Sequence, residues 1–321
     1  MGRSGTRLGA NVKNFILCAA AGAFLAAMFS AASAEDIPGP DQQEAKKAFG
    51  AVKAPVAQAP QAIGRYEHGC IAGAQSIAAN GAGWQTMRLS RNRFWGHPIL
   101  IGYIQRLASD VRRLDGLPGI LVGDMGQPIG GPLLGGHASH QMGLDVDLWY
   151  TLMPERALLA DEREHLAADN MVDKVALTTD TKMWTEAQAR LLRRAASYPE
   201  VARIFVHPAV KKTLCEIAGN DRSWLKKIRP WSGHDDHFHI RLICPQGSPA
   251  CVSQAPVSAN DDGCGQELDD WFKKLRAPPP TRKRTVQPAK PMLVSDLPKE
   301  CQALLLAAEN AAKEKDAWTP N

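Results

Sequence analysis

Histidine and aspartate residues gather in two short segments of this sequence, residues 137–147 and residues 234–239. Five of the nine histidines lie there, together with several aspartates. Imidazole and carboxylate groups are common zinc ligands, and a catalytic zinc site takes three protein ligands and leaves a fourth position for water. The two segments therefore predict a zinc site assembled from distant parts of the chain.

Each segment contains or adjoins an alternating pattern that is typical of a β-strand. In residues 144–148 two aspartates alternate with leucine and valine, and in residues 237–242 two histidines and an arginine alternate with phenylalanine, isoleucine and leucine. Successive side chains of a strand point to opposite faces of a sheet. Both strands are therefore expected to turn their polar residues to one face, where two such strands would form a site.

Helices are expected around these strands, from apolar periodicity and from start and stop signals. The expected ranges are 98–113, 155–169, 183–197, 209–218, 265–275 and 299–313. A short apolar run at 204–207 indicates another strand, and the glycines and prolines of 117–136 indicate a long loop across the mouth of the site. We therefore expect an α+β fold, with a small, mostly antiparallel sheet that carries the zinc site, surrounded by helices and long loops and linked by disulfides.

Residues 1–34 have the pattern of a cleavable signal peptide, with basic residues, an apolar stretch and a small-residue end, which predicts export. Removal of this segment takes away three basic residues and lowers the formal net charge from +5 to +2. A nearly neutral exported protein is not expected to bind nucleic acid. No later apolar run is long enough for a membrane-spanning helix, so we expect no transmembrane segment in the mature chain.

Differences in composition divide residues 35–321 into four segments. Residues 35–63 are rich in proline and alanine without apolar periodicity and are interpreted as a flexible leader, and residues 64–275 form the domain that holds both segments. Residues 276–296 are basic and proline-rich, and 297–321 are expected to form a C-terminal helix and tail. We interpret 276–296 as a solvated tether, and the alternative is a patch that docks anionic lipid or cell-wall polymer.

Six cysteines follow the signal segment: Cys70, Cys215, Cys244, Cys251, Cys264 and Cys301. In an exported protein an even number indicates disulfides, although their pairing cannot be deduced from sequence alone. Zinc binding by thiolates is the alternative, and the spacings lack the paired C-x2-C motifs that it would need.

Three strings, RNRFWGHP at 91–98, GGHASHQMGLDVD at 135–147 and WSGHDDHFH at 231–239, resemble those of the penicillin-insensitive murein endopeptidases of Gram-negative bacteria. These enzymes are zinc peptidases related to the lysostaphin-type endopeptidases and the D-Ala-D-Ala metallopeptidases. The resemblance covers roughly residues 65–275 and continues more weakly to Cys301. The resemblance implies that residues 64–275 form a zinc peptidase domain and that the protein is a periplasmic hydrolase.

The resemblance also implies a role for each histidine and aspartate of the site. It places Zn2+ on His140, Asp147 and His239. His237 would not bind the metal but would hydrogen-bond the reacting groups, and His234 would act as the proton shuttle. His234 stands where the related dipeptidases have a glutamate base.

An odd spacing separates two of these ligands. His140 and Asp147 would lie on opposite faces of one straight strand, because side chains alternate with a period of two. Gly143 is therefore expected to break the geometry, with His140 on a loop and Asp147 on the strand.

Other residues near the two segments have open assignments. His137 could be an additional metal ligand, a substrate contact or a residue that orients a ligand, while Arg91 and His97 are candidates to hold a peptide carboxylate. Three neighbouring aspartates could orient imidazoles, although a surface position is the default for any one of them: Asp145, Asp235 and Asp236.

The resemblance implies a definite pairing of the six cysteines. The implied disulfides are Cys70 with Cys301, Cys215 with Cys264, and Cys244 with Cys251.

The implied activity is hydrolysis of the D-alanyl to meso-diaminopimelyl cross-link between peptidoglycan stem peptides. One alternative is a D,D-carboxypeptidase or dipeptidase of the same group, which would need a charged anchor for a free carboxylate. The other is a non-catalytic zinc-stabilised module that binds the cell wall, against which His234 and His237 argue. A serine enzyme is not favoured, because SWLK at 223–226 fits S-x-x-K but no K-T-G follows. The oligomeric state is left open.

Overall fold

The computed structural model describes residues 42–278 and 290–318. The expected signal peptide at 1–34 lies outside the described residues, as do the start of the expected leader and the middle of the expected tether. In the described part of the chain, no helix is long and apolar enough to cross a membrane.

Strands and short helices alternate through the first half of the described chain. In order, the elements are α1 (Ala45–Ala51), β1 (Gln61–Arg65), β2 (His68–Ala72), β3 (Gln75–Ser76), β4 (Asn80–Gly81), β5 (Trp84–Thr86), the 3-10 helix η2 (Leu89–Arg91), β6 (Trp95–Gly96), α2 (Pro98–Asp115), β7 (Ile120–Val122), β8 (Asp145–Trp149) and α3 (Ala160–His165).

The second half supplies the remaining strands of the main sheet and four further α-helices. These elements are β9 (Val172–Asp173), β10 (Thr178–Thr179), α4 (Glu186–Ala196), β11 (Val201–Val206), α5 (Pro208–Ile217), the 3-10 helix η3 (Ser223–Lys227), β12 (Ile228–Pro230), β13 (His237–Leu242), α6 (Gln266–Arg276), the 3-10 helix η4 (Val294–Asp296) and α7 (Lys299–Trp318).

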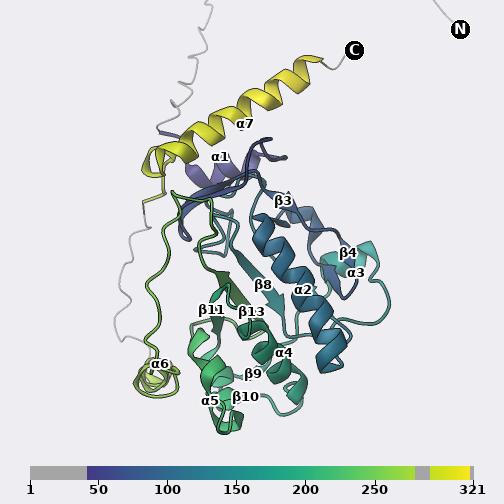
Figure 1. The fold of residues 1–321 in the computed structure, drawn as a ribbon, viewed down its shortest axis with the longest axis vertical. Coiled ribbons are helices and arrows are strands. Elements are labelled where there is room, and N and C mark those ends of the chain that lie inside the picture. The colour runs from purple at the N-terminus through teal and green to yellow at the C-terminus, as the bar shows by residue number, and fades with distance from the viewer. Residues whose placement is uncertain (1–41, 279–289, 319–321) are drawn as a thin grey trace, which may run out of the picture. The chain divides into compact units, whose positions relative to one another are not determined.

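The main sheet has seven strands in the order β12-β11-β13-β8-β7-β5-β4 (Figure 1). Its pairs are antiparallel except β11 with β12 and β5 with β7. The expectation of a mostly antiparallel sheet within an α+β fold is confirmed. The strands β8 and β13 lie side by side near the middle, so the polar faces of the two expected strands form one surface.

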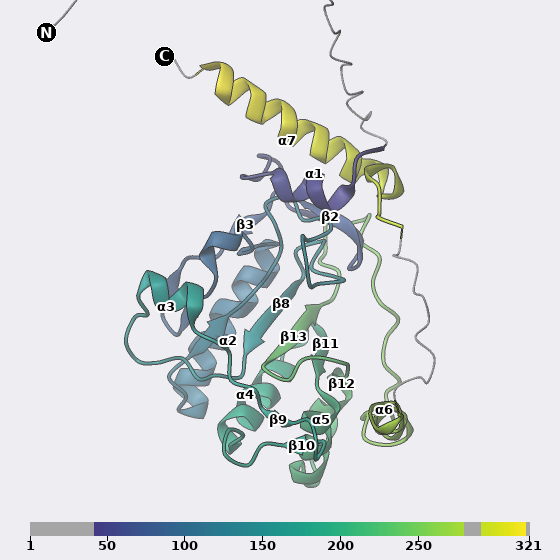
Figure 2. The same cartoon turned by 180° about the vertical axis from the view of Figure 1, so that it is seen from behind.

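The apolar faces of β8 and β13 belong to the main hydrophobic core. Val146, Leu148, Phe238, Ile240 and Leu242 are all fully buried there. Figures 1 and 2 show α2 along one side of these strands, in front of them in one view and behind them in the other. Burial of each such side chain contributes about 1.5–3 kcal/mol, so this packing fixes the strands that carry the site.

Helix α2 begins and ends as its sequence predicts. The Nδ1 atom of His97 accepts a hydrogen bond from the backbone N–H of Ile99, and Pro98 occupies the first helical position. Gly116 closes the helix in a left-handed conformation, with φ of +67°.

A second, smaller hydrophobic cluster joins the two ends of the described chain. Phe49 of α1 is fully buried in it, and the N–H of Ala45 donates to the carbonyl of Met292. The expectation of a flexible leader is therefore wrong for residues 42–63, which form α1 and the start of β1. The end of the expected tether is also structured, since η4 packs in this cluster through Val294.

Two further expectations need correction. The helix expected at 155–169 is reduced to α3, because buried Gln85 binds the backbone of Pro154, Arg156 and Leu158 and holds this stretch as a loop. The loop expected at 117–136 contains β7, which pairs with β5 and β8 inside the main sheet.

All three implied disulfides are confirmed. The bonded pairs are Cys70–Cys301, Cys215–Cys264 and Cys244–Cys251. The first ties α7 to β2, and the last closes a small loop directly after β13.

Candidate metal centre

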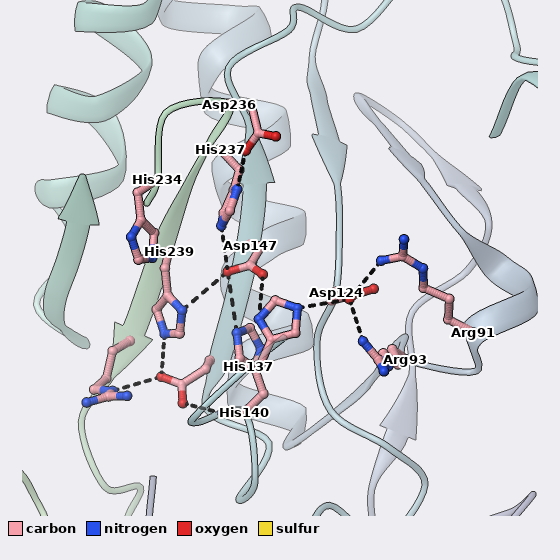
Figure 3. A network of polar contacts seen from close by, with 12 residues as sticks. Arg91, Arg93, Asp124, His137, His140, Asp147, His234, Asp236, His237 and His239 are labelled. Atoms are coloured by element: carbon pink, nitrogen blue, oxygen red, sulfur yellow. Dashed lines mark hydrogen bonds and ion pairs between the residues drawn. The ribbon is translucent and has the colours of Figure 1, made fainter. Parts of the chain in front are cut away.

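The register of β13 on β8 places Asp147 directly opposite His239. Both side chains are buried, and Nδ1 of His239 lies 3.3 Å from Oδ1 of Asp147 (Figure 3). The alternation expected from sequence is thus confirmed, and the pairing of the two strands brings an imidazole and a carboxylate together.

His140 reaches the same carboxylate from the loop before β8. Its Nε2 atom lies 3.4 Å from Oδ1 of Asp147, and its side chain is fully buried. His140 itself has φ of +68°, as does Gly143, where a Cβ would lie 2.4 Å from the side chain of Ile71. The expected break at Gly143 is present, and the left-handed conformation of His140 is a second break that the sequence did not indicate.

Two of the three spacings among these donor atoms fit a tetrahedral metal. Zinc–nitrogen and zinc–oxygen bonds of about 2.0–2.1 Å separate neighbouring tetrahedral ligand atoms by about 3.3–3.4 Å. Oδ1 of Asp147 is 3.4 Å from one imidazole nitrogen and 3.3 Å from another. Within the described residues, Oδ1 of Asp147 and both ring nitrogens of His140 are buried without a hydrogen-bond partner. Buried polar atoms rarely stay unpaired, so this donor set is suited to holding a cation.

His137 lies beside the same carboxylate. Its Nδ1 atom is 3.4 Å from Oδ2 of Asp147, and its Nε2 atom is 3.0 Å from Oδ2 of Asp124. The donor atoms of His137, His140 and Asp147 all lie within 4.8 Å of one another, so these three residues could hold a metal ion. The structure therefore groups His137 with His140 and Asp147, while His239 contacts the shared carboxylate of Asp147 but is not a member of that group.

Asp145 contacts two of the candidate ligands, His140 and His239. It is fully buried, accepts hydrogen bonds from the backbone N–H of His140 at 3.0 Å and from Nε of Arg241 at 2.9 Å, and lies 3.0 Å from Nε2 of His239. Burial alone would raise the pKa of Asp145, but the charges of Arg241 and His239 outweigh it and hold the pKa below its usual range. The default surface position is therefore wrong for Asp145, which orients two of the candidate ligands.

His237 is the first residue of β13, two positions before His239, and lies at the edge of the site. Its Nδ1 atom lies 2.6 Å from Oδ1 of Asp236, and its Nε2 atom lies 3.9 Å from Oδ1 of Asp147. Burial lowers the pKa of His237, but the charges of Asp147 and Asp236 outweigh this effect and raise the pKa to about 9. Asp236 therefore orients the ring toward the carboxylate that the other imidazoles share.

His234 lies beside this group on the loop before β13. Its ring centre is 5.1 Å from that of His237 and 6.0 Å from that of His239. Nδ1 lies 2.9 Å from the carbonyl oxygen of Ser232, which can only accept, so Nδ1 carries the proton and Nε2 is the free base in the neutral ring. Burial, together with the neighbouring imidazoles, lowers the pKa of His234 to about 4.

A cavity of about 220 Å3 opens beside the carboxylate of Asp147. Its wall includes Arg91, whose Nη1 lies 3.0 Å from Asp124, but His97 is not among the lining residues. His97 is buried and caps α2 instead, so the structure brings only one of the two candidate carboxylate-binding residues to the site. Two charged lining residues had no expected role: Asp124 and Arg88.

Asp124 is the one of these two with a clear effect on the centre. A single oxygen, Oδ2, meets Arg91, Arg93 and His137 at 2.9–3.0 Å (Figure 3). Burial would raise the pKa of Asp124, but the hydrogen bond from His137 and the two guanidinium groups lower it to about 2. The sequence signal was a lone aspartate in a glycine-rich loop, which does not reveal such contacts.

The fold and the site together define a class of protein. Clustered imidazoles lie around the buried carboxylate of Asp147, three of them contact further carboxylates, and an open cavity adjoins them, an arrangement that is compatible with a hydrolase that binds a metal ion. The chain matches the family model of penicillin-insensitive murein endopeptidase over residues 62–306, and it belongs to that family.

Individual relatives support this assignment. A penicillin-insensitive murein endopeptidase of Haemophilus influenzae is 46% identical over 237 residues, which cover 73% of this chain and 81% of that protein. Those of Pectobacterium atrosepticum and Klebsiella pneumoniae are 41% and 42% identical, covering 81% and 79% of this chain and 89% of each relative.

Proposed function

We propose that this protein is a zinc-dependent endopeptidase of the periplasm that hydrolyses D-alanyl to meso-diaminopimelyl cross-links between peptidoglycan stem peptides. The observation that carries the proposal is the pair of imidazole nitrogens 3.3 Å and 3.4 Å from one unpartnered oxygen of Asp147. Its relatives' description as murein endopeptidases supports the substrate.

We assign His140, Asp147 and His239 as the residues that hold the zinc ion. When bound there, zinc would supply a Lewis acid that polarises the scissile carbonyl and activates a water molecule. His239 is preferred to His137 because it is buried on β13 opposite Asp147 and is backed by Asp145. Three protein ligands also leave a position open for chemistry, whereas all four residues together would close a tetrahedral site.

The remaining histidines supply proton transfer and charge stabilisation. His237 is held by Asp236 with Nε2 toward the centre, from where an N–H can donate to the oxygen of the carbonyl under attack. His234 offers the free Nε2 base that its contact with Ser232 implies, so it can take a proton from the attacking water and pass it to the leaving amine. His137 is assigned to the cavity wall, where Asp124 fixes its ring.

The proposed location rests on the signal-like residues 1–34 and on the disulfides. Three disulfides are stable in an oxidising compartment and are rare in the cytosol. In the periplasm the enzyme would meet its polymeric substrate directly.

A D,D-carboxypeptidase is the second candidate, because the arginines Arg88 and Arg91 on the cavity wall could anchor a terminal carboxylate. One experiment separates the two activities. Purified protein is incubated with cross-linked muropeptide dimers and with monomeric pentapeptides, with and without a chelator, and the products are separated by mass. Monomers released from dimers identify the endopeptidase, whereas D-alanine released from pentapeptides identifies the carboxypeptidase. Activity that survives exhaustive chelation would rule out the metal.

A further inference from the structure

Two arginines stand between the metal centre and the outer surface. Arg88 and Arg91 line the 220 Å3 cavity that also borders Asp147 and His237. The same two residues line a neighbouring, more open cavity of about 690 Å3. Any ligand that extends from the metal centre through the first cavity toward the second must pass these two side chains.

The positive charge of Arg88 is balanced, among the described side chains, only at longer range by the carboxylate of Glu164. Among the residues that the structure describes, Arg88 forms no ion pair, and its Nη1 atom is buried without a hydrogen-bond partner. A buried charged donor without an acceptor is costly, so such groups usually have a partner when the protein is functional. A small movement of the side chain toward the adjacent cavity would let an anionic ligand provide one.

The guanidinium of Arg88 is nevertheless held in place. Nη2 donates to the carbonyl of Leu166 at 2.8 Å, and the group lies 5.6 Å from the ring centre of Trp149, another lining residue. The backbone of Arg88 is in the left-handed region, with φ of +56°, and its N–H donates to the carbonyl of Arg163. The side chain is thus oriented before any ligand arrives, which lowers the entropic cost of binding.

Arg91 adds further donors on the same wall. It contacts Asp124 through Nη1, and its side chain is 47% exposed. Arg93 and His137 contact the same carboxylate, so the single negative charge of Asp124 is shared among two guanidinium groups and one imidazole. The carboxylates of Asp124, Asp147 and Asp236 also line this cavity, so an anion is favoured only beside Arg88 and Arg91, where a planar guanidinium matches the geometry of a carboxylate.

We propose that Arg88, assisted by Arg91, binds the carboxylate that the substrate carries beside the scissile nitrogen. This inference rests on the proposed function. In a D-alanyl to meso-diaminopimelyl cross-link, the leaving amine sits on a carbon that also bears a free carboxylate. With the scissile carbonyl at the metal centre, that carboxylate lies on the leaving-group side, and its capture by Arg88 selects this bond over amide bonds that lack a neighbouring carboxylate.

The test compares two substrates and matched variants. Cross-linked muropeptide dimers are prepared with the carboxylate beside the scissile nitrogen either free or amidated. Both are given to the wild type, to Arg88→Gln, to Arg88→Lys, and to the control Arg113→Gln, which changes an exposed arginine on α2. Zinc content and melting temperature confirm that each variant is folded.

We expect the wild type and the control to prefer the free carboxylate by about 10- to 100-fold in kcat/KM, the effect of one charge-assisted hydrogen bond. Arg88→Gln should lose that preference, mainly through KM, and Arg88→Lys should keep part of it. The losses from amidation and from Arg88→Gln should not add, because both remove the same contact.

Two results would overturn the inference: a wild type that cleaves both dimers equally well, or an Arg88→Gln variant with the wild-type preference. Equal cleavage of both dimers would leave the proposed function intact. If neither dimer is cleaved, the proposed function fails, and binding of the diaminopimelyl product peptide decides the inference separately. Calorimetry should then show tighter binding of the free than of the amidated peptide, lost in Arg88→Gln. Equal affinities would reject the role of Arg88.

Discussion

His239 and Asp147 face each other directly across β13 and β8, with 3.3 Å between Nδ1 and Oδ1. Because this contact depends on the register of two strands, a slip of β13 by one residue would turn the His239 side chain to the face opposite Asp147. The apolar residues of the same strands, including Val146 and Ile240, are fully buried and hold the register. The geometry of the metal centre is therefore a consequence of core packing.

The ligand assignment predicts which histidines control metal content. Substitution of His140 or His239 by alanine should lower bound zinc to well below one ion per chain, since each removes one of three protein ligands. His137→Ala should retain zinc, and the exposed His165→Ala serves as the control. Elemental analysis after dialysis measures the result. Loss of zinc in His137→Ala with retention in His239→Ala would transfer the third ligand position to His137.

His234 and His237 should affect turnover without affecting the metal. Alanine at either position is expected to lower kcat by about 100-fold or more, the usual effect of losing an acid–base group or a contact to the developing oxyanion. Zinc content should stay near that of the wild type, because neither residue is assigned as a ligand. Zinc content and steady-state kinetics are measured on the same preparations. A variant that loses both metal and activity would show that its histidine binds the metal.

Asp145 and Arg241 form a buried ion pair whose halves depend on each other. The distance from Nε of Arg241 to Oδ1 of Asp145 is 2.9 Å, and both side chains are at most 10% exposed. Asp145→Ala leaves the guanidinium without its carboxylate and should lower the free energy of unfolding by about 3–5 kcal/mol. The pair Asp145→Ala with Arg241→Met should recover part of this loss.

Urea denaturation in the presence of a chelator measures the effect on this ion pair, because bound zinc would add its own stabilisation. Strict additivity of the two substitutions would contradict the coupling.

Local patterns predicted much of this structure. Strands β8 and β13 follow from alternation of polar and apolar residues, and the expected helix at 98–113 corresponds to α2 (Pro98–Asp115), since such patterns act within a few residues. The role of Asp124 was not predicted, and orientation of an imidazole by Asp145 was only an alternative to a surface position, because both roles depend on partners that the fold brings from elsewhere: Arg93 and Arg241. The helix α1 was missed because a single buried aromatic residue, Phe49, gives no periodic signal.

The disulfides predict a ranking of stability. Cys70–Cys301 spans 231 residues and Cys244–Cys251 spans seven. In the loop-entropy model the first contributes about 5 kcal/mol and the second about 2.5 kcal/mol. Removal of Cys70 and Cys301 together should therefore lower the free energy of unfolding more than removal of Cys244 and Cys251. Denaturation of both double-alanine variants without metal tests this order, and the reverse order would show that strain or residual structure dominates.

Lys211 predicts a pH dependence that is independent of the metal centre. Its side chain is fully buried, and Nζ donates to the carbonyl oxygens of Leu225 at 2.8 Å and Asp262 at 2.6 Å. Burial, together with the positive charge of Arg229, lowers the pKa of Lys211 from 10.5 to about 7. The folded protein therefore releases this proton at a lower pH than the unfolded chain.

The sign of the effect follows from proton binding. Between pH 7 and pH 10.5 the unfolded chain holds the Lys211 proton that the folded protein has released, so stability rises with pH by up to about 1.4 kcal/mol per pH unit. Below pH 7 both states hold the proton, and this contribution is constant. From pH 7 to pH 9 the wild type should gain about 2 kcal/mol relative to Lys211→Met, in which this titration is absent.

Urea denaturation at pH 7, 8 and 9 gives the free energy of unfolding at each pH, and the gain is the difference between the slopes of wild type and Lys211→Met. The two carbonyl groups left unsatisfied in Lys211→Met lower its stability equally at every pH, so they do not change the slope. Lys212→Met is the matched control, because it removes a positive charge from the neighbouring side chain, which is 45% exposed. If Lys211→Met and Lys212→Met show the same pH dependence as the wild type, Lys211 is charged in the folded protein, and its two carbonyl contacts outweigh the cost of burial.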